Sequence, residues 1–376
     1  MLKVGILSMQ RIFNYGSFLQ AYALKKILEE LGCNVQFVDY HIEKCLVDSN
    51  KKKGIYRKIL KVIEVFKYKA PFKEKIKFIQ YKKNYASNYY PYLGVNNNMN
   101  YTPYLDMLII GSDEVFNCVQ NNTNVGYSLE LFGKGHNAKR LVSYAASFGN
   151  TTLDKLDKYN IKKEIAGYLK KFDSISVRDE NTGNIIKCLT EKNFEYNLDP
   201  VLIYDYINKC NDIPQTIEES NYIVLYGYSG RFTDEECNFI KNYIKEKNLK
   251  IYCIGGVQNC CDKFIDCSPF KVIAYFQHAE FVITDTFHGT IMSIITHKRF
   301  VSLVRKNGYG NFEKLTDLLN RINLTSRIIE NITFLDEILN NPINYDDVDN
   351  IIQKERLHTY DYLKKQIDVL NGGNHE

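Results

Sequence analysis

The sequence alternates short apolar runs, most of them ending at glycine, serine or aspartate, with longer segments whose apolar residues recur at helical spacing. Residues 3–7 form the first such run, a helical segment follows, and residues 35–40 form the next run. Ser17 stands where a residue would cap this helix, and Gly32 stands where the helix would end. Parallel strands need a crossover connection of a dozen or more residues, which is usually a helix. The pattern therefore predicts an α/β fold built from parallel sheets.

The alternation occurs in two sets, separated by a polar connection at residues 208–220. A chain of 376 residues is longer than one hydrophobic core ordinarily supports. We therefore expect two doubly wound parallel-sheet domains facing a cleft, at residues 1–205 and 206–345, with a charged terminal helix at 346–376 that packs back across them. Further strands are expected at residues 105–110, 141–145, 174–177, 222–226, 250–254, 281–284 and 300–304, and further helices from about 180, at 233–247 and at 270–279.

Much of the positive charge lies in a basic helical insertion, which we expect at about residues 48–90. Residues 51–83 hold 13 lysines and arginines against two glutamates, in a chain whose net charge is +5. Apolar residues of this segment fall on one side of a helix, at Ile55, Ile59, Ile63 and Phe66. Two interpretations are open: a solvated helical insertion, or a basic amphipathic surface that rests on an anionic membrane. No nucleic-acid-binding motif accompanies the charge, so nucleic acid is not an expected partner.

Several classes of protein are excluded by what the sequence lacks. It has no stretch of about 18 uncharged apolar residues, so no membrane-spanning helix is expected. Its N-terminus enters an apolar strand directly and shows no signal peptide, so we expect a cytoplasmic protein. The ten cysteines include no Cys-x-x-Cys pair. Because the group Cys253, Cys260, Cys261 and Cys267 lacks the spacing of a structural zinc site, we expect free buried thiols and no metal.

Six segments, most of them at the ends of the expected strands, carry polar or glycine-rich motifs. In open parallel sheets, ligands bind beyond the carboxyl ends of the strands, so these segments are the informative ones. They are residues 14–24 (NYGSFLQAYAL), 111–117 (GSDEVFN), 143–149 (SYAASFG), 176–179 (SVRD), 198–200 (LDP) and 284–290 (TDTFHGT). In their order and spacing, over about residues 3–305, they resemble the polysaccharide pyruvyl transferase family.

This resemblance implies a two-domain fold like that of the GT-B glycosyltransferases, with the site between the domains. It implies a bacterial transferase that moves pyruvate from phosphoenolpyruvate onto a pair of sugar hydroxyls, giving a cyclic ketal and free phosphate. It implies no essential metal, and phosphoenolpyruvate is a donor substrate, not a cofactor. The implied setting is exopolysaccharide or capsule biosynthesis, in the cytoplasm or on the inner face of the cell membrane, with a glycan or lipid-linked sugar as acceptor.

Three side chains are candidates for the chemistry. Arg178 ends a strand, and its planar guanidinium can hold the carboxylate or phosphate of phosphoenolpyruvate in two parallel hydrogen bonds. His288 stands between a strand and a helix expected near Thr290, where it could protonate the departing phosphate or the methylene carbon. Asp113 could act as base on the sugar hydroxyl. The structural alternatives are an Arg178–Asp179 ion pair, a His288 that supports its turn, and an Asp113 that caps a helix.

The same loops supply the residues expected to bind substrate. The amides of Gly289, Thr290 and Ile291 would point at a bound anion, as helix N-termini do for phosphate. Asp199 and Asp285 are expected to shape their turns. Besides Arg178, the expected substrate-binding residues are Asn14, Gly16, Ser112, Asn117, Ser147, Thr286, Gly289 and Thr290.

One position departs from the family's pattern. Where the pyruvyl transferases read Asp-Arg-x-His-Gly, with the arginine on the donor's phosphate, this chain has Thr286. A hydroxyl cannot supply that charge, and a charge-assisted contact contributes about 1.5–3 kcal/mol. Either another cation replaces it, with Arg231, Arg305 and Lys306 as candidates, or the donor differs. A GT-B-type glycosyltransferase using a nucleotide sugar and a non-catalytic membrane-surface assembly protein are the alternative functions.

Overall fold

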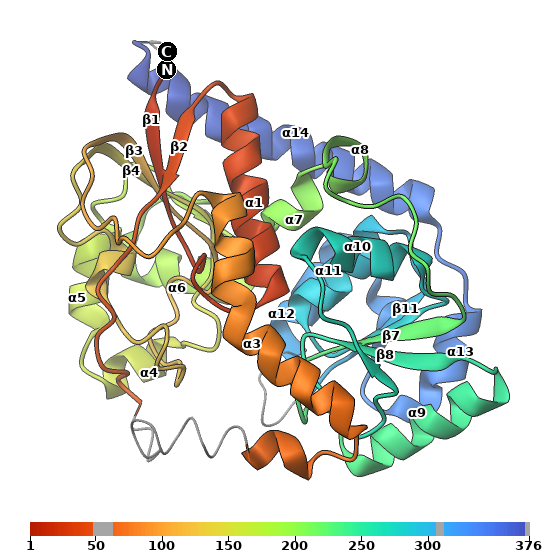
Figure 1. The fold of residues 1–376 in the computed structure, drawn as a ribbon. Helices are drawn as coiled ribbons and strands as arrows, with labels where there is room; N and C mark the ends of the chain where they lie inside the picture. Colours follow the sequence, from red (N-terminus) through yellow and green to blue (C-terminus); the bar gives the residue numbers. More distant parts are fainter. Residues whose placement is uncertain (48–62, 306–311, 373–376) are drawn as a thin grey trace.

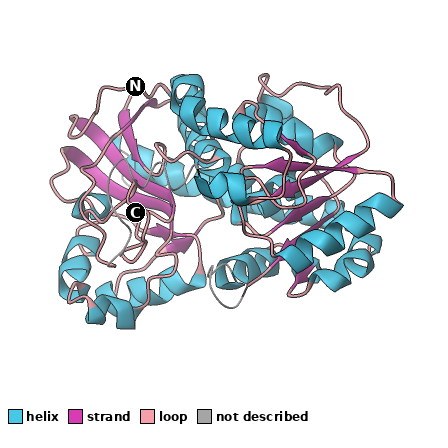
Figure 2. Cartoon of the chain, turned by 60° about the horizontal axis from the view of Figure 1, so that its bottom comes forward, coloured by secondary structure: helices cyan, strands magenta, loops and turns pink. Residues whose placement is uncertain are grey.

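The chain forms two α/β domains, each built around its own six-stranded sheet (Figure 1). The computed structural model describes residues 1–47, 63–305 and 312–372. All pairings between the named strands are parallel. Figure 2 shows the two sheets in separate halves of the molecule, with helices packed around each. The predicted class, two doubly wound parallel-sheet domains, is confirmed.

The first sheet has the strand order β2-β1-β3-β4-β5-β6. Its inner strands are buried on both faces, as the strands of parallel sheets usually are. In β3, Met107 and Ile109 belong to one hydrophobic cluster, whereas Leu108 and Ile110 belong to another. The bounds of the strands are β1 (Lys3–Leu7), β2 (Asn34–Phe37), β3 (Leu105–Asp113), β4 (Ala138–Ala146), β5 (Ser176–Val177) and β6 (Glu195–Tyr196).

The second sheet has the strand order β12-β11-β10-β7-β8-β9. Two of its strands have the bounds that the sequence predicted, because both are continuous apolar runs with clear polar limits. The two other predicted strands are each one residue shorter than expected. The two strands of only two residues each were not predicted. The bounds are β7 (Tyr222–Tyr226), β8 (Lys250–Ile254), β9 (Lys263–Phe264), β10 (Val282–Thr284), β11 (Phe300–Leu303) and β12 (Ile328–Ile329).

Helices connect the strands and cover the sheets. In chain order they are α1 (Tyr15–Glu30), α3 (Phe72–Leu93), α4 (Leu153–Lys158), α5 (Lys162–Leu169), α6 (Glu180–Thr190), α7 (Pro200–Ile203), α8 (Tyr206–Lys209), α9 (Asp234–Glu246), α10 (Pro269–His278), α11 (Phe287–Ile295), α12 (Phe312–Arg321), α13 (Leu335–Asn340) and α14 (Tyr345–Leu370).

The start of α1 corrects the predicted cap. Asn14, not Ser17, caps the helix: Asn14 is extended, and its side-chain oxygen accepts a hydrogen bond from the Gly16 amide. Asparagine is as good a cap as serine, and its earlier place gives the helix one more turn. Ser17 therefore lies in the first turn, where its hydroxyl is free to contact a neighbouring loop.

The described part of the basic insertion connects the two domains. Helix α3 leaves the first domain and reaches strand β9 at the edge of the second sheet (Figure 1). Glu74 accepts a hydrogen bond from the Phe264 amide at 2.8 Å, and the Phe78 ring packs edge-on against Phe264. Buried tyrosines of α3 join the hydrophobic core, so this helix is a structural bridge and not simply a solvated insertion. Ile55 and Ile59 lie outside the described residues.

The terminal helix α14 runs along both domains (Figure 1). Its first residue, Tyr345, donates a hydrogen bond to the Lys298 carbonyl of the second domain at 2.6 Å. Further on, Tyr362 donates to the Ser143 carbonyl of the first domain at 2.8 Å. One hydrophobic cluster extends from a face of the first sheet through α1, α3 and α7 into the second domain. The domains therefore share a core, which fixes the loops between them.

Two properties of the whole chain bear on its class. Among the residues that the structure describes, no helix is long and apolar enough to cross a membrane. The ten cysteines are free thiols, and Cys188 alone is exposed. The expectation of free buried thiols is thus confirmed for the other nine.

Candidate active site

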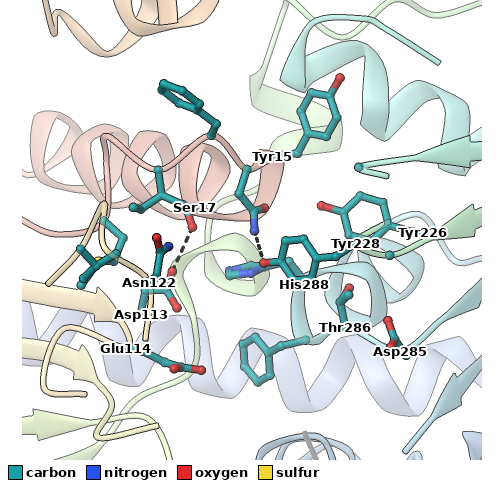
Figure 3. A pocket seen from close by; sticks show the side chains of 18 of the residues that line it. Tyr15, Ser17, Asp113, Glu114, Asn122, Tyr226, Tyr228, Asp285, Thr286 and His288 are labelled. Carbon is teal, nitrogen blue, oxygen red and sulfur yellow. Dashed lines mark hydrogen bonds between the residues drawn. The ribbon is translucent and has the colours of Figure 1, made fainter. Parts of the chain in front are cut away.

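A cavity of about 240 Å³ lies between the domains, where loops from both sheets meet (Figure 3). The strand order reverses between β1 and β3 in the first sheet and between β7 and β10 in the second. Doubly wound sheets bind ligands at such points, beyond the carboxyl ends of the strands. The cavity wall contains polar residues at or beyond the carboxyl end of each of these four strands, among them Asn14, Asp113, Tyr228 and His288. The topology thus builds a single site from both domains.

The buried carboxylate of Asp199 joins two of the predicted residues. Its Oδ2 atom accepts a hydrogen bond from Nη1 of Arg178 at 3.0 Å and lies 3.5 Å from Nε2 of His288. The hydroxyl of Ser112 also approaches Oδ2, at 3.4 Å. The other oxygen of Asp199 accepts from the Val201 amide, which is the turn-shaping role expected from the sequence. Arg178 and His288, which are 110 positions apart in the sequence, thus both contact the carboxylate of Asp199.

The ion pair between Asp199 and Arg178 stays charged although both side chains are buried. Burial disfavours ionisation of Asp199, but His288 and Arg178 outweigh it and hold the pKa of this carboxyl below its usual value. Burial likewise opposes the charge on Arg178, but Asp113 and Asp199 keep the pKa of the guanidinium above its usual value. The wall around Arg178 and His288 therefore contains a permanent cation beside an oriented imidazole.

Gly16 lies directly against the ring of His288. A Cβ atom at Gly16 would sit 2.2 Å from Cγ and 2.4 Å from Nδ1 of the imidazole, closer than real contacts allow. The first turn of α1, in one domain, therefore packs against a histidine of the other domain. Only glycine permits this approach.

We expect Gly16→Ala to displace His288 and to lower kcat about 100-fold, because misplacing a catalytic group by about 1 Å can cost that much. Gly167→Ala is the matched control, since a Cβ atom at Gly167 meets nothing within 4 Å. Both variants would be compared in turnover and in thermal unfolding. Full activity of a folded Gly16→Ala protein would contradict a role for the position of this ring.

The start of α11 corrects the predicted anion site. The helix begins at Phe287, not near Thr290, because the hydroxyl of Thr286 caps it by accepting from the Gly289 amide at 3.0 Å. The Thr290 amide bonds to the Thr286 carbonyl, and the Thr290 hydroxyl bonds to Ser302 inside the domain. The amides of Phe287 and His288 are the first two of the helix, so they are the ones positioned for an anion.

Asp113 faces the cavity and does not cap a helix. Its residue has a left-handed backbone (φ 76°), which aspartate tolerates better than most residues, and no helix follows it. Its carboxylate accepts from the hydroxyl of Ser17 at 3.2 Å and lies 3.5 Å from Nη1 of Arg178. The structural alternative considered for Asp113 is therefore wrong, and the carboxylate is available to a ligand.

Other expected binding residues lie behind the wall. Asn117 is buried and bonds to Glu114 and Thr151. Ser147 accepts from the Gly149 amide. Neither lines the cavity, and neither do Gly16, Ser112, Gly289 and Thr290, whereas Asn14, Arg178 and Thr286 do. The motif residues that do not line the cavity therefore support the loops whose other side chains form its wall.

Two charged residues of the wall, Glu114 and Lys314, were not predicted as site residues. Glu114 of the first domain pairs with Lys314 of α12 in the second domain. Burial raises the pKa of Glu114, but Lys314, Arg178 and Asn117 outweigh it and lower the pKa to about 2. Glu114 stands in one of the six motifs and could have been singled out. Lys314 has no local signal, because only the folding of α12 over the cleft brings it there.

The part of the chain that the structure describes contains no candidate metal site. No group of three or more histidine, cysteine, aspartate or glutamate side chains has a geometry suited to an ion there. The site contains several carboxylate–cation contacts around an imidazole.

Comparison with known proteins identifies the family. A family model described as polysaccharide pyruvyl transferase matches residues 14–307, which is most of the chain. This chain belongs to the polysaccharide pyruvyl transferase family. A search of curated proteins finds no match to this pyruvyl transferase family member.

Solved structures with the same architecture support the fold of this family member. A UDP-N-acetylglucosamine 2-epimerase is 10% identical, with a TM-score of 0.51 over 100% of this chain and 97% of that one. A protein from Listeria monocytogenes assigned as a UDP-N-acetylglucosamine 2-epimerase is 10% identical, with a TM-score of 0.50 over 99% and 98% of the chains. An α-glucosyltransferase in complex with UDP is 11% identical, with a TM-score of 0.46 over 99% and 100%. The two epimerases share the two-domain parallel-sheet fold of this pyruvyl transferase family member, which is GT-B-like.

The surroundings of Thr286 distinguish the cations named as substitutes for the family's arginine. Arg231 lines the cavity and donates from Nε to Asp285 at 2.7 Å, next to Thr286. Arg305 makes a two-bond contact with Glu236, at 3.0 Å each, and is not part of the cavity wall. Lys306 lies outside the described residues. In this pyruvyl transferase family member, Arg231 is the candidate that reaches the site.

Proposed function

We propose that this protein transfers pyruvate from phosphoenolpyruvate onto a pair of sugar hydroxyls. The observation that carries the proposal is the buried arrangement of Arg178, Asp199 and His288 at the wall of the cavity. Phosphoenolpyruvate has two anionic groups that need cationic partners and an enol carbon that needs a proton. The family supports a transferase, and the site offers both features.

The reaction balances without a redox partner. One hydroxyl oxygen of the sugar bonds to C2 of phosphoenolpyruvate while C3 gains a proton and becomes a methyl group. The second hydroxyl oxygen then bonds to C2 as the bond from C2 to the phosphate oxygen breaks. The two hydroxyls lose two protons, of which one balances the proton gained at C3 and the other leaves with phosphate or to solvent.

Arg178 is suited to hold an anionic group of the donor. Its Nη1 atom contacts Asp199 and Asp113, while its Nε atom is buried without a hydrogen-bond partner among the described residues. The guanidinium carbon lies 4.3 Å from the centre of the Phe287 ring, so the charged group lies over an aromatic ring. A preorganised fork of this kind favours carboxylate or phosphate ligands.

His288 and Asp113 are suited to move the protons. Nε2 of His288 is buried, lies 3.5 Å from Asp199 and makes no hydrogen bond to the described residues, so the imidazole is oriented toward this carboxylate. Catalytic hydrogen bonds are often this long before substrate binds. His288 delivers a proton to C3 or to the departing phosphate, and Asp113 accepts one from the attacking hydroxyl.

We expect Arg231→Ala to weaken donor binding about tenfold or more, because a charge-assisted contact to phosphate contributes about 1.5–3 kcal/mol. Arg305→Ala should weaken donor binding less, since that guanidinium pairs with Glu236 and does not line the cavity. Titration of each variant with phosphoenolpyruvate, followed by thermal shift, measures the difference. Equal affinity of Arg231→Ala and wild type would show that another group replaces the family's arginine.

A thermal-shift screen followed by a phosphate-release assay tests the proposed function. A ligand that binds only the folded protein raises the melting temperature, by an amount set by its concentration relative to its Kd. Stabilisation by phosphoenolpyruvate, and phosphate release that requires a sugar acceptor, would support pyruvyl transfer. Stabilisation by a nucleotide alone would indicate a glycosyltransferase. No stabilisation by either would favour a non-catalytic assembly protein.

We also propose that the enzyme acts in exopolysaccharide or capsule biosynthesis in the bacterial cytoplasm, in contact with an anionic membrane. The described part of the basic insertion exposes three apolar side chains: Ile63 is 49% exposed, Phe66 38% and Phe72 68%. Lys67 and Lys73 follow Phe66 and Phe72 in the sequence. Basic and aromatic residues together favour anionic lipid surfaces. Sedimentation with anionic vesicles, but not with neutral ones, is the expected result, and equal sedimentation with both would contradict it.

A further inference from the structure

A chain of alternating charges runs from α9 of the second domain to the cavity. Its members are Glu236, Arg305, Asp285 and Arg231. Glu236 accepts two hydrogen bonds from Arg305, at 3.0 Å each, and Nε of Arg305 lies 3.5 Å from Oδ2 of Asp285. The same oxygen accepts a hydrogen bond from Nε of Arg231 at 2.7 Å. The last two members line the cavity and the first two do not, so the chain ends with a cation in the cavity wall.

Asp285 is confined between the loops that carry the two arginines. Its side chain is fully buried, and a Cβ atom at Gly227, in the loop after β7, would lie only 3.1 Å from its Oδ1 atom. The turn after β10 has a support of its own, since the hydroxyl of Thr284 accepts a hydrogen bond from the Thr286 amide at 3.1 Å. The carboxylate of Asp285 therefore connects the loops that follow β7 and β11.

Two arginines that share one carboxylate oxygen depend on its charge. Burial opposes the charge on Arg305, but Glu236 and Asp285 outweigh it and raise the pKa of this guanidinium above its usual value. Without the charge of Asp285, the two guanidinium groups would repel each other at short range in a partly buried place. Arg305 has a second carboxylate in Glu236, so Arg231 is the arginine that we expect to move.

Arg231 lies beside the start of α11, where the site can receive an anion. The cavity wall includes Arg231 together with Thr286, Phe287 and His288. Figure 3 shows Asp285, Thr286 and His288 on one side of the cavity. The amides of Phe287 and His288 are the first of the helix, and helix N-termini attract phosphate. The place of the Arg231 guanidinium therefore decides whether the cation and the helix start act on one phosphate.

We propose that Asp285 is a positioning residue that holds Arg231 against the phosphate of the donor. The inference rests on the proposed function, which supplies phosphoenolpyruvate as donor, and it adds the residue that sets the place of the cation. The bond between Arg231 and Asp285 is charge-assisted, and such bonds are about twice as strong as neutral ones. Because its side chain is fully buried, Asp285 acts on the donor through Arg231 and not by contact.

Asp285→Asn is expected to raise the KM for phosphoenolpyruvate about tenfold, the loss expected of a misplaced charged partner, and to change kcat by less than about twofold. A contact that is equally strong before and during the reaction affects KM and not kcat. The double variant Arg231→Ala/Asp285→Asn should have the KM of Arg231→Ala alone, because residues that act through one contact have non-additive effects. Phosphate-release kinetics measure both constants.

Glu219→Gln is the matched control. It removes a carboxylate from an ion pair with Lys263 in the same domain, outside the cavity wall, and should leave KM unchanged. An unchanged KM in Asp285→Asn, or effects that multiply in the double variant, would overturn the inference. If Asp285→Asn alone does not fold, the same substitution in an Arg305→Ala background removes one charge of each sign. A KM equal to that of Arg305→Ala would then overturn it.

Inorganic phosphate, a product of the proposed reaction, separates this inference from the proposed function. Its binding can be followed by phosphorus NMR. Phosphate binding that weakens about tenfold in both Asp285→Asn and Arg231→Ala, in a protein without turnover of phosphoenolpyruvate, would support the positioning of Arg231 and contradict pyruvyl transfer. Turnover with a wild-type KM in Asp285→Asn would keep pyruvyl transfer and overturn the positioning. A protein that binds neither phosphate nor phosphoenolpyruvate would contradict both.

Discussion

Replacement of His288 by alanine is expected to lower kcat about 10²- to 10⁴-fold, the range that general acid–base groups contribute. The imidazole is confined on two sides, since Gly16 lies against Cγ and Nδ1 and Asp199 lies 3.5 Å from Nε2. The protein should remain folded, because Arg178 continues to pair with Asp199. Phosphate release at saturating phosphoenolpyruvate and acceptor measures the effect.

His358→Ala is the matched control for this experiment. His358 is half-exposed on α14, where it contacts Glu195 at 3.5 Å, far from the cavity wall. Its removal should leave turnover unchanged. Wild-type kcat in a folded His288→Ala protein would remove the proton donor from the mechanism, and a loss of activity in both variants would point to an effect on the fold.

Arg178→Ala should abolish stabilisation by phosphoenolpyruvate and should also destabilise the free protein. Removing one partner of a buried ion pair costs about 3–5 kcal/mol, because a charge is left without compensation. Here Asp199 is fully buried and would keep only His288 as a charged partner. A thermal-shift titration with phosphoenolpyruvate measures the first effect, and urea unfolding of the free protein measures the second.

Arg178→Lys separates the two roles of Arg178. Lysine restores a positive charge near Asp199 but not the planar fork, so stability should largely return while donor affinity stays low. Arg299→Ala, at an exposed position, controls for loss of a positive charge elsewhere. Donor binding by Arg178→Lys at the wild-type level would mean that the fork is not a ligand of phosphoenolpyruvate.

The sequence predicted the architecture well where local signals were strong. Strands β7 and β8 were predicted with their observed bounds, since each is an apolar run with polar limits. The helix predicted at residues 233–247 forms as α9, and Thr233 and Glu236 make a capping box at its start. The two-residue strands β6, β9 and β12 escaped prediction, because so short a pairing depends on the neighbouring strand and not on local sequence.

The site was predicted only where a motif marked it. Arg178 and His288 stood out because each follows a strand in a recognisable segment. Their common partner Asp199 was expected only to shape a turn, since the contact between the two motifs forms in three dimensions. Lys314 had no signal for the same reason. The Thr290 hydroxyl faces Ser302, because helix phase, set by the cap at Thr286, decides which side chains reach the cavity.

The shared core has a consequence for how this molecule loses its structure. Apolar side chains of α1, α3 and α7 continue into the second sheet, and α14 is bonded to both halves. Separating the halves would expose this surface to water, so neither half gains by persisting alone. A chain of two domains often unfolds in two steps, but we expect this chain to unfold in one. The cleft between its domains should therefore persist until the whole chain unfolds.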